Sequence, residues 1–461
     1  MKTFFCILFL QLSFVIVNAQ TVPDKRFSAA QLKEDLAFLK TQITRVHAMP
    51  YSELSEKQYD KLFSEIESKL KDSLTATDFI KLVKPVIAYL SDEHAQLNLK
   101  KELHAATFGN GSVCIPFSLV QKGNDYVTEE ILAGNSSIGK GVKVTAVNNI
   151  PVADWISKCA LQTSGFPGQR VEAALAQFGY LFAFANTTYD SSFTISTTAN
   201  KTIVVKGITI TAWRDYFNRN ADHADCEERI TYQRFGNTGY INACSFDVGG
   251  NGPNSMTAVR SKIDSIFKLI HNDNVKNLVI DVSSNGGGNS AVGDYMIAYF
   301  YAKPYQDYQY TWKRSDEYLK LLESWGLKDE RYAATPVGQT IYGAPETVTP
   351  QAMPLFFTGK VTVVVGKGTF SSAMLFATLI KDNHIATLIG EVPRHGHPNH
   401  FGEMYNNNFP NTRIQVSFGV KEWIRPAGKK KGQDNLLHPD IVLTPAEMMN
   451  AESIVKKVQS L

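Results

Sequence analysis

The sequence lacks a surplus of either charge. Its 461 residues contain 47 Lys and Arg against 44 Asp and Glu, which gives a net charge of +3. A basic surplus of the kind that binds nucleic acid is therefore missing, and so is an acidic surplus suited to cation storage. The hydrophobic fraction of 44% and the charged fraction of 20% are ordinary for a folded protein. They exclude a disordered chain, a collagen-like fibre and a coiled-coil rod.

Long apolar runs are also missing after residue 20. The start of the chain differs, because Lys2 precedes the apolar stretch Phe4–Val17 and small residues follow up to Ala19. This pattern predicts a secretory signal peptide at residues 1–19, with an uncleaved anchor as the alternative. We therefore expect an exported protein, periplasmic or extracellular, whose mature chain has no membrane span.

Cysteines are few, and none has the spacing of a zinc site. Four of the five follow the predicted signal peptide, at positions 114, 159, 226 and 244. These four allow more than one pairing, which the sequence leaves open. The chain also has no Walker loop and no GxGxxG motif. We expect no cofactor and no metal.

Apolar side chains at helical spacing fill the first hundred residues. The stretches 28–47, 56–70 and 77–90 each carry one apolar face, which predicts three helices. Ser28 and Gln31 form the pattern of a capping box at the start of the first. These helices predict an N-terminal helical domain at residues 20–105.

The rest of the chain divides into two regions that differ in their pattern of expected strands and helices. Short β-rich runs and turns predict a small β-rich domain at 106–210, in which residues 173–185 are apolar and have a helical composition. Strands and helices alternate in the remainder, 211–461, which predicts an α/β layer with right-handed crossovers. Residues 303–355 are rich in Tyr, Lys, Glu and Pro, and we expect them to form a long surface excursion.

A strand, a glycine turn and two serines form the first candidate site. Residues 360–365 predict a buried strand, two glycines follow, and Ser371 and Ser372 then open a helix. A hydroxyl at this point lies beside the free N–H groups of the first helical turn, which favour negative charge. A serine that attacks a carbonyl needs such donors for the developing oxyanion. The alternative is an ordinary serine N-cap.

Two more segments offer the other groups that this reaction needs. Asn285 to Gly288 end a predicted strand without bulky side chains, so their backbone N–H groups can stabilise an oxyanion. A plain tight turn is the alternative. His94, just beyond the third predicted helix, can act as a general base if it lies within hydrogen-bond reach of the serine. An exposed or capping histidine is the alternative there.

A histidine-rich segment is the last candidate. His395, His397 and His400 lie close together, and histidines so placed can bind a metal ion. Pro398 breaks any helical face, however, and the spacing matches no zinc motif. A loop that lines the substrate site, or one on the surface, is the reading that the spacing favours.

In combination these segments resemble the tail-specific, or C-terminal-processing, serine peptidases and their tricorn-core relatives. The block KVTVVVGKGTFSSAMLFATLIKDNHIATLIGE resembles the strand, serine turn and helix of that family. NLVIDVSSNGGG resembles its Asn-x-Gly-Gly strand end, LLHPDIVL its late Pro-Asp block, and VTAVNNIPVADWI its embedded peptide-binding module. The resemblance implies an α/β fold: a crotonase/ClpP-like ββα protease core with an N-terminal helical unit and an embedded PDZ-like β-rich domain.

The resemblance also implies roles for single residues. The nucleophile falls on Ser371, with Ser372 as the alternative nucleophile. The N–H of Ser372 and that of Gly287 or its neighbour Gly288 fall on the oxyanion donors. His94 falls on the base of the tricorn-like branch.

Three positions complete this comparison with the family. Asp434 lies where the tricorn-like branch has a late acid. Gly396 and Met374 stand where the Ser/Lys branch has a Lys base and a Glu. A Ser/Lys dyad therefore cannot be assigned to this chain.

We therefore expect a secreted serine-type peptidase that acts on a polypeptide substrate. Two alternatives stay open. A non-catalytic protein of the same fold would bind peptides or hydrophobic ligands, since the Lys base is missing and no third residue is clear. A metal-assisted hydrolase would use His395, His397 and His400. No nucleic-acid partner is expected, and the sequence does not indicate an oligomeric state.

Overall fold

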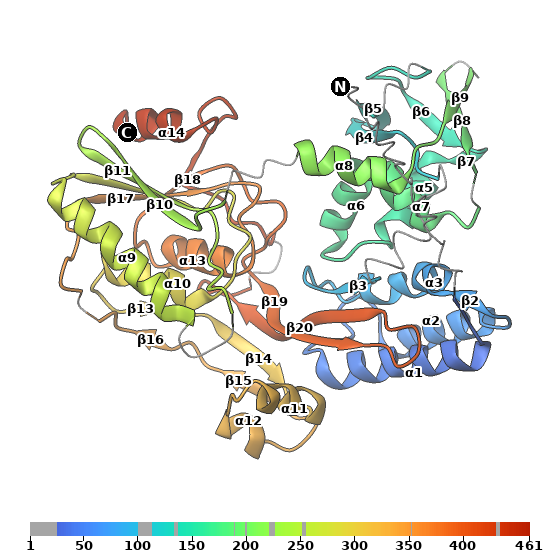
Figure 1. Ribbon diagram of the computed structural model, residues 1–461, viewed down its shortest axis with the longest axis horizontal. Helices are drawn as coiled ribbons and strands as arrows, with labels where there is room; N and C mark the ends of the chain where they lie inside the picture. The colour runs from blue at the N-terminus through green and yellow to red at the C-terminus, as the bar shows by residue number, and fades with distance from the viewer. Residues whose placement is uncertain are drawn as a thin grey trace, which may run out of the picture.

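The computed structural model describes residues 25–99, 113–132, 137–188, 190–198, 201–220, 226–250, 255–351, 353–429 and 434–461. The predicted signal peptide lies outside them. Figure 1 shows a helical unit, a β-rich domain beside it, and a larger α/β domain that carries the C-terminus. None of the helices in the described ranges has the length and apolar character that a membrane span needs.

The N-terminal unit consists of the three predicted helices, α1 (Ala29–Val46), α2 (Glu56–Lys69) and α3 (Ala76–Ala88). The predicted capping box is confirmed, since the Ser28 and Gln31 side chains each bond the other residue's backbone N–H. Short strands complete the unit: β1 (Arg26–Phe27), β2 (Leu74–Thr75) and β3 (Gln96–Asn98). Its apolar cluster also includes aromatic side chains from far along the chain, such as Trp312, Tyr405 and Phe418. The helical unit therefore shares its core with the α/β domain.

The described part of the β-rich domain contains two small sheets and the four helices α5–α8. The hairpin β4 (Phe117–Lys122) and β5 (Asp125–Ile131) lies apart from a sheet of order β7-β6-β8-β9. That sheet contains β6 (Val144–Val147), β7 (Ile150–Pro151), β8 (Ser192–Thr197) and β9 (Thr202–Lys206). The helices are α5 (Val152–Ala160), α6 (Pro167–Ala176), α7 (Phe178–Ala185) and α8 (Ile210–Asn220). These elements are compatible with a PDZ-like module.

Tertiary packing changes two details of this domain. Residues 173–185 are helical as expected, but they belong to two helices, since α6 ends at Ala176, Gln177 is its C-cap and α7 begins at Phe178. A Cβ on Gly179 would lie 1.8 Å from the carbonyl oxygen of Ile115, so α7 takes its own direction to pack closely on the segment before β4. The indole of Trp213 in α8 also donates to the Ile115 carbonyl, at 2.7 Å. The packing of this domain thus continues past residue 210.

The α/β domain is built on a six-stranded sheet of order β10-β11-β12-β17-β18-β21. Only the β10–β11 pair is antiparallel, and the other neighbours are parallel. The strands are β10 (Ile230–Phe235), β11 (Thr238–Ala243), β12 (Asn277–Asp281), β17 (Lys360–Val365), β18 (Thr387–Gly390) and β21 (Ile441–Val442). Its helices are α9 (Ser255–Asn272), α10 (Ser290–Ala298), α13 (Ser371–Asp382) and α14 (Ala451–Gln459). The predicted α/β layer is confirmed.

A second sheet joins the α/β domain to the helical unit. Its order is β15-β14-β20-β19, and β3 of the helical unit pairs with β20. The long hairpin of β19 (His400–Asn408) and β20 (Gln415–Ile424) reaches across to α1 (Figure 1). Because β3 follows His94 by two residues, this pairing fixes the predicted base relative to the α/β domain.

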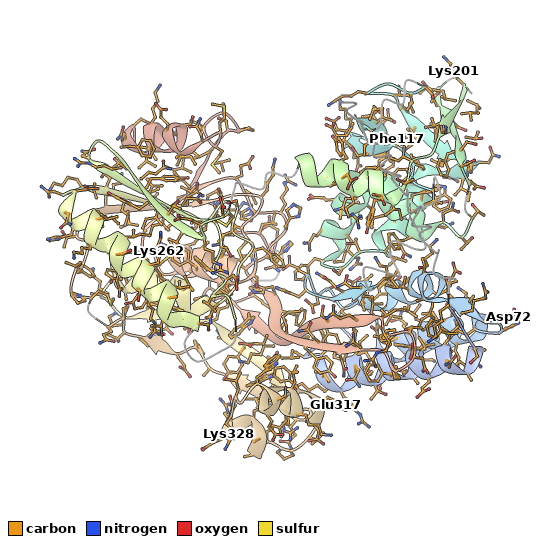
Figure 2. All side chains as sticks on the ribbon, viewed as in Figure 1. Asp72, Phe117, Lys201, Lys262, Glu317 and Lys328 are labelled. Carbon is orange, nitrogen blue, oxygen red and sulfur yellow. A yellow bond between two sulfur atoms is a disulfide. The ribbon has the colours of Figure 1, made fainter. Side chains whose placement is uncertain are left out.

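The segment 303–355 contributes to that sheet and is not only a surface excursion. It contains β13 (Tyr305–Gln306), β14 (Gln309–Lys313), α11 (Asp316–Ser324), α12 (Glu330–Ala334), β15 (Thr340–Gly343) and β16 (Thr347–Val348). Glu317 and Lys328 mark the lobe around α11 and α12 in Figure 2. Trp312 and Tyr332 are buried and stack with ring centroids 4.2 Å apart. Part of the segment therefore belongs to the core.

Polar contacts fasten the β-rich domain to the helical unit. Arg170 is buried and donates to Glu53 at 2.6 Å and to the Ala88 carbonyl at the end of α3 at 2.6 Å. The backbone N–H of Gly165 donates to the carbonyl of Asp92 at 3.2 Å. The β-rich domain thus holds the chain segment that carries His94.

The four cysteines in the described ranges form one disulfide and leave two free thiols. Cys226 and Cys244 form a disulfide, whereas Cys114 and Cys159 are free and buried. Cys244 directly follows β11, and two residues later the N–H of Phe246 donates to the Gly287 carbonyl at 2.9 Å. The disulfide therefore anchors the strand that borders residues 285–288, the glycine turn.

Candidate active site

Ser371 lies where β17 passes through a tight turn into α13. The turn packs closely on the end of β12, since a Cβ on Gly368 would come within 2.9 Å of the Ser284 backbone. Thr369 fastens it by donating its hydroxyl to the Val282 carbonyl at 2.8 Å. Ser371 itself has φ 50°, in the left-handed region. A non-glycine residue there costs about 1–3 kcal/mol, and such strain gathers at functional sites.

The structure brings Ser371 and His94 together. Nε2 of His94 lies 3.1 Å from Oγ of Ser371, although 277 positions separate them in the chain. The ring of His94 packs against that of Phe370, with centroids 4.7 Å apart. An imidazole that accepts the serine proton at Nε2 carries its own proton on Nδ1.

The surroundings keep His94 neutral. Burial lowers the pKa of His94 below its ordinary value, while the charge of Asp92 and the backbone of Phe401 act in the opposite direction. A neutral imidazole is the form that can accept a proton from serine. The site is thus prepared for general-base chemistry at neutral pH.

Asp92 is a buried carboxylate beside the histidine. Its Oδ1 accepts the backbone N–H of His94 at 2.8 Å, and its Oδ2 accepts that of Gly419 in β20 at 2.7 Å. Burial alone raises the pKa of Asp92, but His47, His94 and the Gly419 N–H together hold it below its ordinary value. Asp92 is therefore ionised. No motif in the sequence points to a role for this residue.

The glycine turn after β12 contacts residues 366–371, the serine turn. A Cβ on Gly287, which has φ +100°, would lie 2.7 Å from the Cβ of Ser371. The Gly287 N–H donates to Oδ1 of Asn285 at 2.8 Å, so this amide already has an acceptor. The Gly288 carbonyl accepts the Ser372 hydroxyl at 2.8 Å. The described residues offer no acceptor to the N–H groups of Gly288 and Ser372.

Asn285 connects the glycine turn to the end of β11 and to the serine turn. It is fully buried, and its Nδ2 donates to the Ala243 carbonyl at the end of β11 at 2.7 Å. Its own carbonyl accepts the N–H of Phe370, directly before the serine, at 3.0 Å. From the sequence, only the backbone N–H groups of this turn were candidates for a role, and the bracing function of the Asn285 side chain is visible only in the tertiary contacts.

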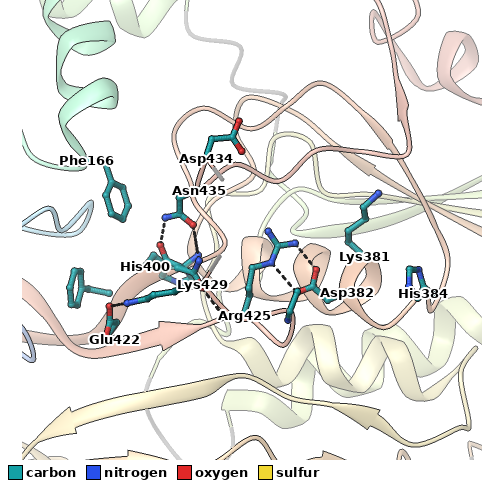
Figure 3. A pocket seen from close by; sticks show the side chains of 14 residues that line it. Phe166, Lys381, Asp382, His384, His400, Glu422, Arg425, Lys429, Asp434 and Asn435 are labelled. Atoms are coloured by element: carbon teal, nitrogen blue, oxygen red, sulfur yellow. Dashed lines mark hydrogen bonds and ion pairs between the residues drawn. The ribbon is translucent and has the colours of Figure 1, made fainter. Parts of the chain in front are cut away.

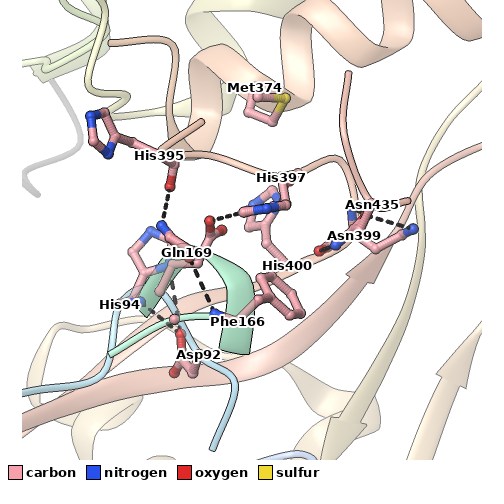
Figure 4. A network of polar contacts seen from close by, with 12 residues as sticks. Asp92, His94, Phe166, Gln169, Met374, His395, His397, Asn399, His400 and Asn435 are labelled. Atoms are coloured by element: carbon pink, nitrogen blue, oxygen red, sulfur yellow. Dashed lines mark hydrogen bonds and ion pairs between the residues drawn. The ribbon is translucent and has the colours of Figure 1, made fainter. Parts of the chain in front are cut away.

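The histidine-rich segment lies over the serine turn and is drawn in Figure 4. Nδ1 of His397 contacts buried Glu93 at 2.5 Å, and Nδ1 of His400 donates to the His397 carbonyl at 2.8 Å. Burial lowers the pKa of His400 to about 3. The Gln169 side chain of α6 donates to the His395 carbonyl at 2.8 Å. No group of three metal-ligating side chains gathers in the part of the chain that the structure describes.

Gly396 and Asp434 occupy different surroundings. A Cβ on Gly396 would lie 2.7 Å from the Thr369 carbonyl, so the turn leaves little room for a Lys at this position. Asp434 is exposed and pairs with His438 at 3.0 Å. It lines a cavity of about 550 Å³ together with His400 and Arg425 (Figure 3).

Known proteins share this architecture. Residues 237–443 match the model of peptidase family S41. The chain superposes on the crystal structure of mature CPAF with a TM-score of 0.56 and 15% identity, covering 94% of this chain and 97% of that one. For mature CPAF complexed with lactacystin the TM-score is 0.55 and the identity is 16%, and the superposition covers 94% of this chain and 98% of the CPAF chain. At these identities the likeness shows a common fold.

A putative peptidase from Parabacteroides merdae has a TM-score of 0.46 and 12% identity, with 94% and 96% of the two chains covered. No curated protein matches the chain by sequence. The matched residues 237–443 contain both the glycine turn and the Ser371 turn. Over residues 237–443, which form this core, the chain is therefore similar to peptidase family S41.

Proposed function

We propose that Ser371 is the nucleophile of this peptidase and His94 its general base. The observation that carries the proposal is the 3.1 Å contact between Nε2 of His94 and Oγ of Ser371. The left-handed backbone of Ser371 also supports it, because the strain presents the hydroxyl at the end of the sheet. A ligand-binding protein on the same scaffold would need neither feature.

The proposed reaction proceeds through an acyl-enzyme. His94 takes the proton of Ser371 as Oγ attacks the peptide carbonyl, and the tetrahedral oxyanion forms. When the oxyanion collapses, the C–N bond breaks and His94 gives the proton to the leaving amine. Water then attacks the ester with His94 again as base, which releases the new carboxyl end and restores Ser371.

Ser372 supplies the first oxyanion donor in this proposal, through its backbone N–H. The second is Gly288 in preference to Gly287, because the Gly287 N–H is engaged by Asn285. The Gly288 carbonyl faces Ser372, whose hydroxyl it accepts. The Ser372 hydroxyl thus braces the turn, which favours Ser371 over Ser372 as the nucleophile.

Export to an oxidising compartment belongs to the same proposal. The pattern of residues 1–19 supports it, and so does the Cys226–Cys244 disulfide, because disulfides persist mainly outside the cytosol. The substrate is then a polypeptide that the enzyme meets in the periplasm or outside the cell.

Labelling with a fluorophosphonate tests the nucleophile directly. The purified mature protein is treated with the reagent, digested and analysed by peptide mass spectrometry. We expect one phosphonylated residue, Ser371, and parallel loss of hydrolysis of an unfolded polypeptide. A label on Ser372, or hydrolysis that continues in fully labelled protein, would show that the assignment is wrong.

Alanine at Gly287 should disable the site, whereas alanine at Gly286 should not. At Gly287 the new methyl group would meet the Cβ of Ser371 at 2.7 Å on a backbone with φ +100°. At Gly286 a Cβ has nothing within 4 Å. The methyl group would also lie 3.0 Å from the backbone nitrogen of Ser372, a proposed oxyanion donor. Because displacing such a donor costs about 10²–10³ in rate, we expect a kcat loss of that order for Gly287→Ala. Steady-state kinetics of the two variants measure the loss of kcat, and thermal unfolding of each shows whether it is folded. Equal losses of kcat in two folded variants would contradict the prediction.

A further inference from the structure

The proton on Nδ1 of His94 has no hydrogen-bond partner within the described residues. Nδ1 is buried there without an acceptor in full bonding geometry, although the backbone of Phe401 lies close enough to raise the pKa of His94. In the proposed reaction, however, His94 becomes an imidazolium, and its Nδ1–H then needs a stabilising partner. A carboxylate close to that nitrogen would supply the counter-charge that a neutral backbone carbonyl lacks.

Asp92 is the carboxylate that meets this need. Its Oδ1 lies 3.8 Å from Nδ1 of His94, and both side chains are largely shielded from solvent, at 0% and 11% exposure. A rotation of the ring that shortens this distance by less than 1 Å would form the bond, and apo sites commonly tighten in this way when substrate binds. The backbone N–H of His94 donates to the same oxygen at 2.8 Å, so the carboxylate keeps a fixed position relative to the ring.

The far side of the Asp92 carboxylate is also secured. Nε2 of His47 lies 3.5 Å from its Oδ2. Nδ1 of His47 accepts the backbone N–H of Met49 at 3.1 Å, so a neutral His47 carries its proton on Nε2, facing Asp92. Together with the Gly419 N–H, His47 offsets the cost of burying the charge.

Asp434, the late acid of the tricorn-like branch, is placed differently. Its two carboxylate oxygens each lie 3.0 Å from Nε2 of His438. Its side chain is 56% exposed, where water screens its charge. Among the described residues its hydrogen bonds therefore run to His438, and none is formed with His94.

We propose that Asp92 is the positioning residue that orients His94 and stabilises its imidazolium, in the place of a late acid. The inference rests on the proposed function, because it assumes that His94 is the base. The base and its acid then come from one turn of the helical unit, two residues apart. The fold holds that turn in place from β20, through the Gly419 N–H.

The test compares Asp92→Asn with Asp434→Asn in the full mature protein. For Asp92→Asn we expect kcat to fall about 10²- to 10⁴-fold with KM nearly unchanged, because the ring loses its orientation and the imidazolium its counter-charge. Loss of that charge should also move the acid limb of the kcat/KM profile to lower pH, since Asp92 raises the pKa of His94. Asp434→Asn should keep the wild-type rate and profile.

A second measurement covers the case in which Asp92→Asn does not fold. Wild-type protein with ¹⁵N-labelled histidine, phosphonylated at Ser371, should show a strongly downfield Nδ1–H resonance for His94. Absence of that resonance would overturn the inference, and so would a folded Asp92→Asn variant with wild-type kcat and pH profile, or a collapse in Asp434→Asn. Failure of the proposed function is distinguishable, because hydrolysis would then survive Ser371→Ala.

Discussion

Ser371→Ala should reduce kcat by about 10⁴- to 10⁶-fold and remove labelling by fluorophosphonates. The change deletes one oxygen and leaves the oxyanion donors in place, so only residual hydrolysis from binding and oxyanion stabilisation should persist. KM should change little, because the hydroxyl contributes to the reaction more than to substrate binding. Hydrolysis of an unfolded polypeptide, followed under single-turnover conditions, measures the loss.

Ser372→Ala is the matched control for this prediction. It removes a hydroxyl from the next residue, which donates to the Gly288 carbonyl at 2.8 Å, while the backbone N–H of residue 372 remains. We expect a modest loss of rate and intact labelling at Ser371. If instead Ser372→Ala abolished labelling while Ser371→Ala retained it, the two serines would have to exchange roles.

His94→Gln should produce the second large effect, a loss of about 10⁴-fold or more in kcat. Glutamine is nearly as long but cannot accept and return a proton, so Ser371 would stay a weak nucleophile. His438→Gln, at an exposed histidine paired with Asp434, provides the control and should keep wild-type activity. Near-normal hydrolysis by His94→Gln would mean that another group activates the serine.

The pH profile of the wild-type enzyme should report the same histidine. Activity requires neutral His94, so kcat/KM should fall as the pH drops through the pKa of this group. Burial lowers that pKa from its ordinary value of 6.5, so the midpoint of the acid limb should lie below pH 6.5. A midpoint above that value would show that charge from Asp92 outweighs burial.

The two proposed catalytic residues are visible in the sequence for different reasons. Ser371 belongs to a local pattern, because residues 360–372 contain a predicted strand, small turn residues and the start of a helix in direct succession. His94 carries no such local signal, and its assignment depended on the resemblance of its segment to the peptidase family. The structure places both side chains within 3.1 Å of each other.

Asp92 and Asn285 show what the sequence did not reveal. Both are buried polar residues whose partners lie far along the chain: Gly419 for Asp92, and Ala243 for Asn285. A buried polar group must find a hydrogen-bond partner, but the sequence does not show which one. Their positioning roles could therefore not be predicted before the strands were assembled.

Local chemistry determined the helices of the N-terminal unit, the α/β alternation and the serine turn, because apolar periodicity and helix caps act over a few neighbouring residues. Tertiary structure alone decided how these parts meet. The hairpin of β19 and β20 pairs with β3, and Trp312 and Phe418 complete the core of the helical unit. Such contacts join segments hundreds of residues apart, and they form because each part has an apolar face that it cannot bury by itself.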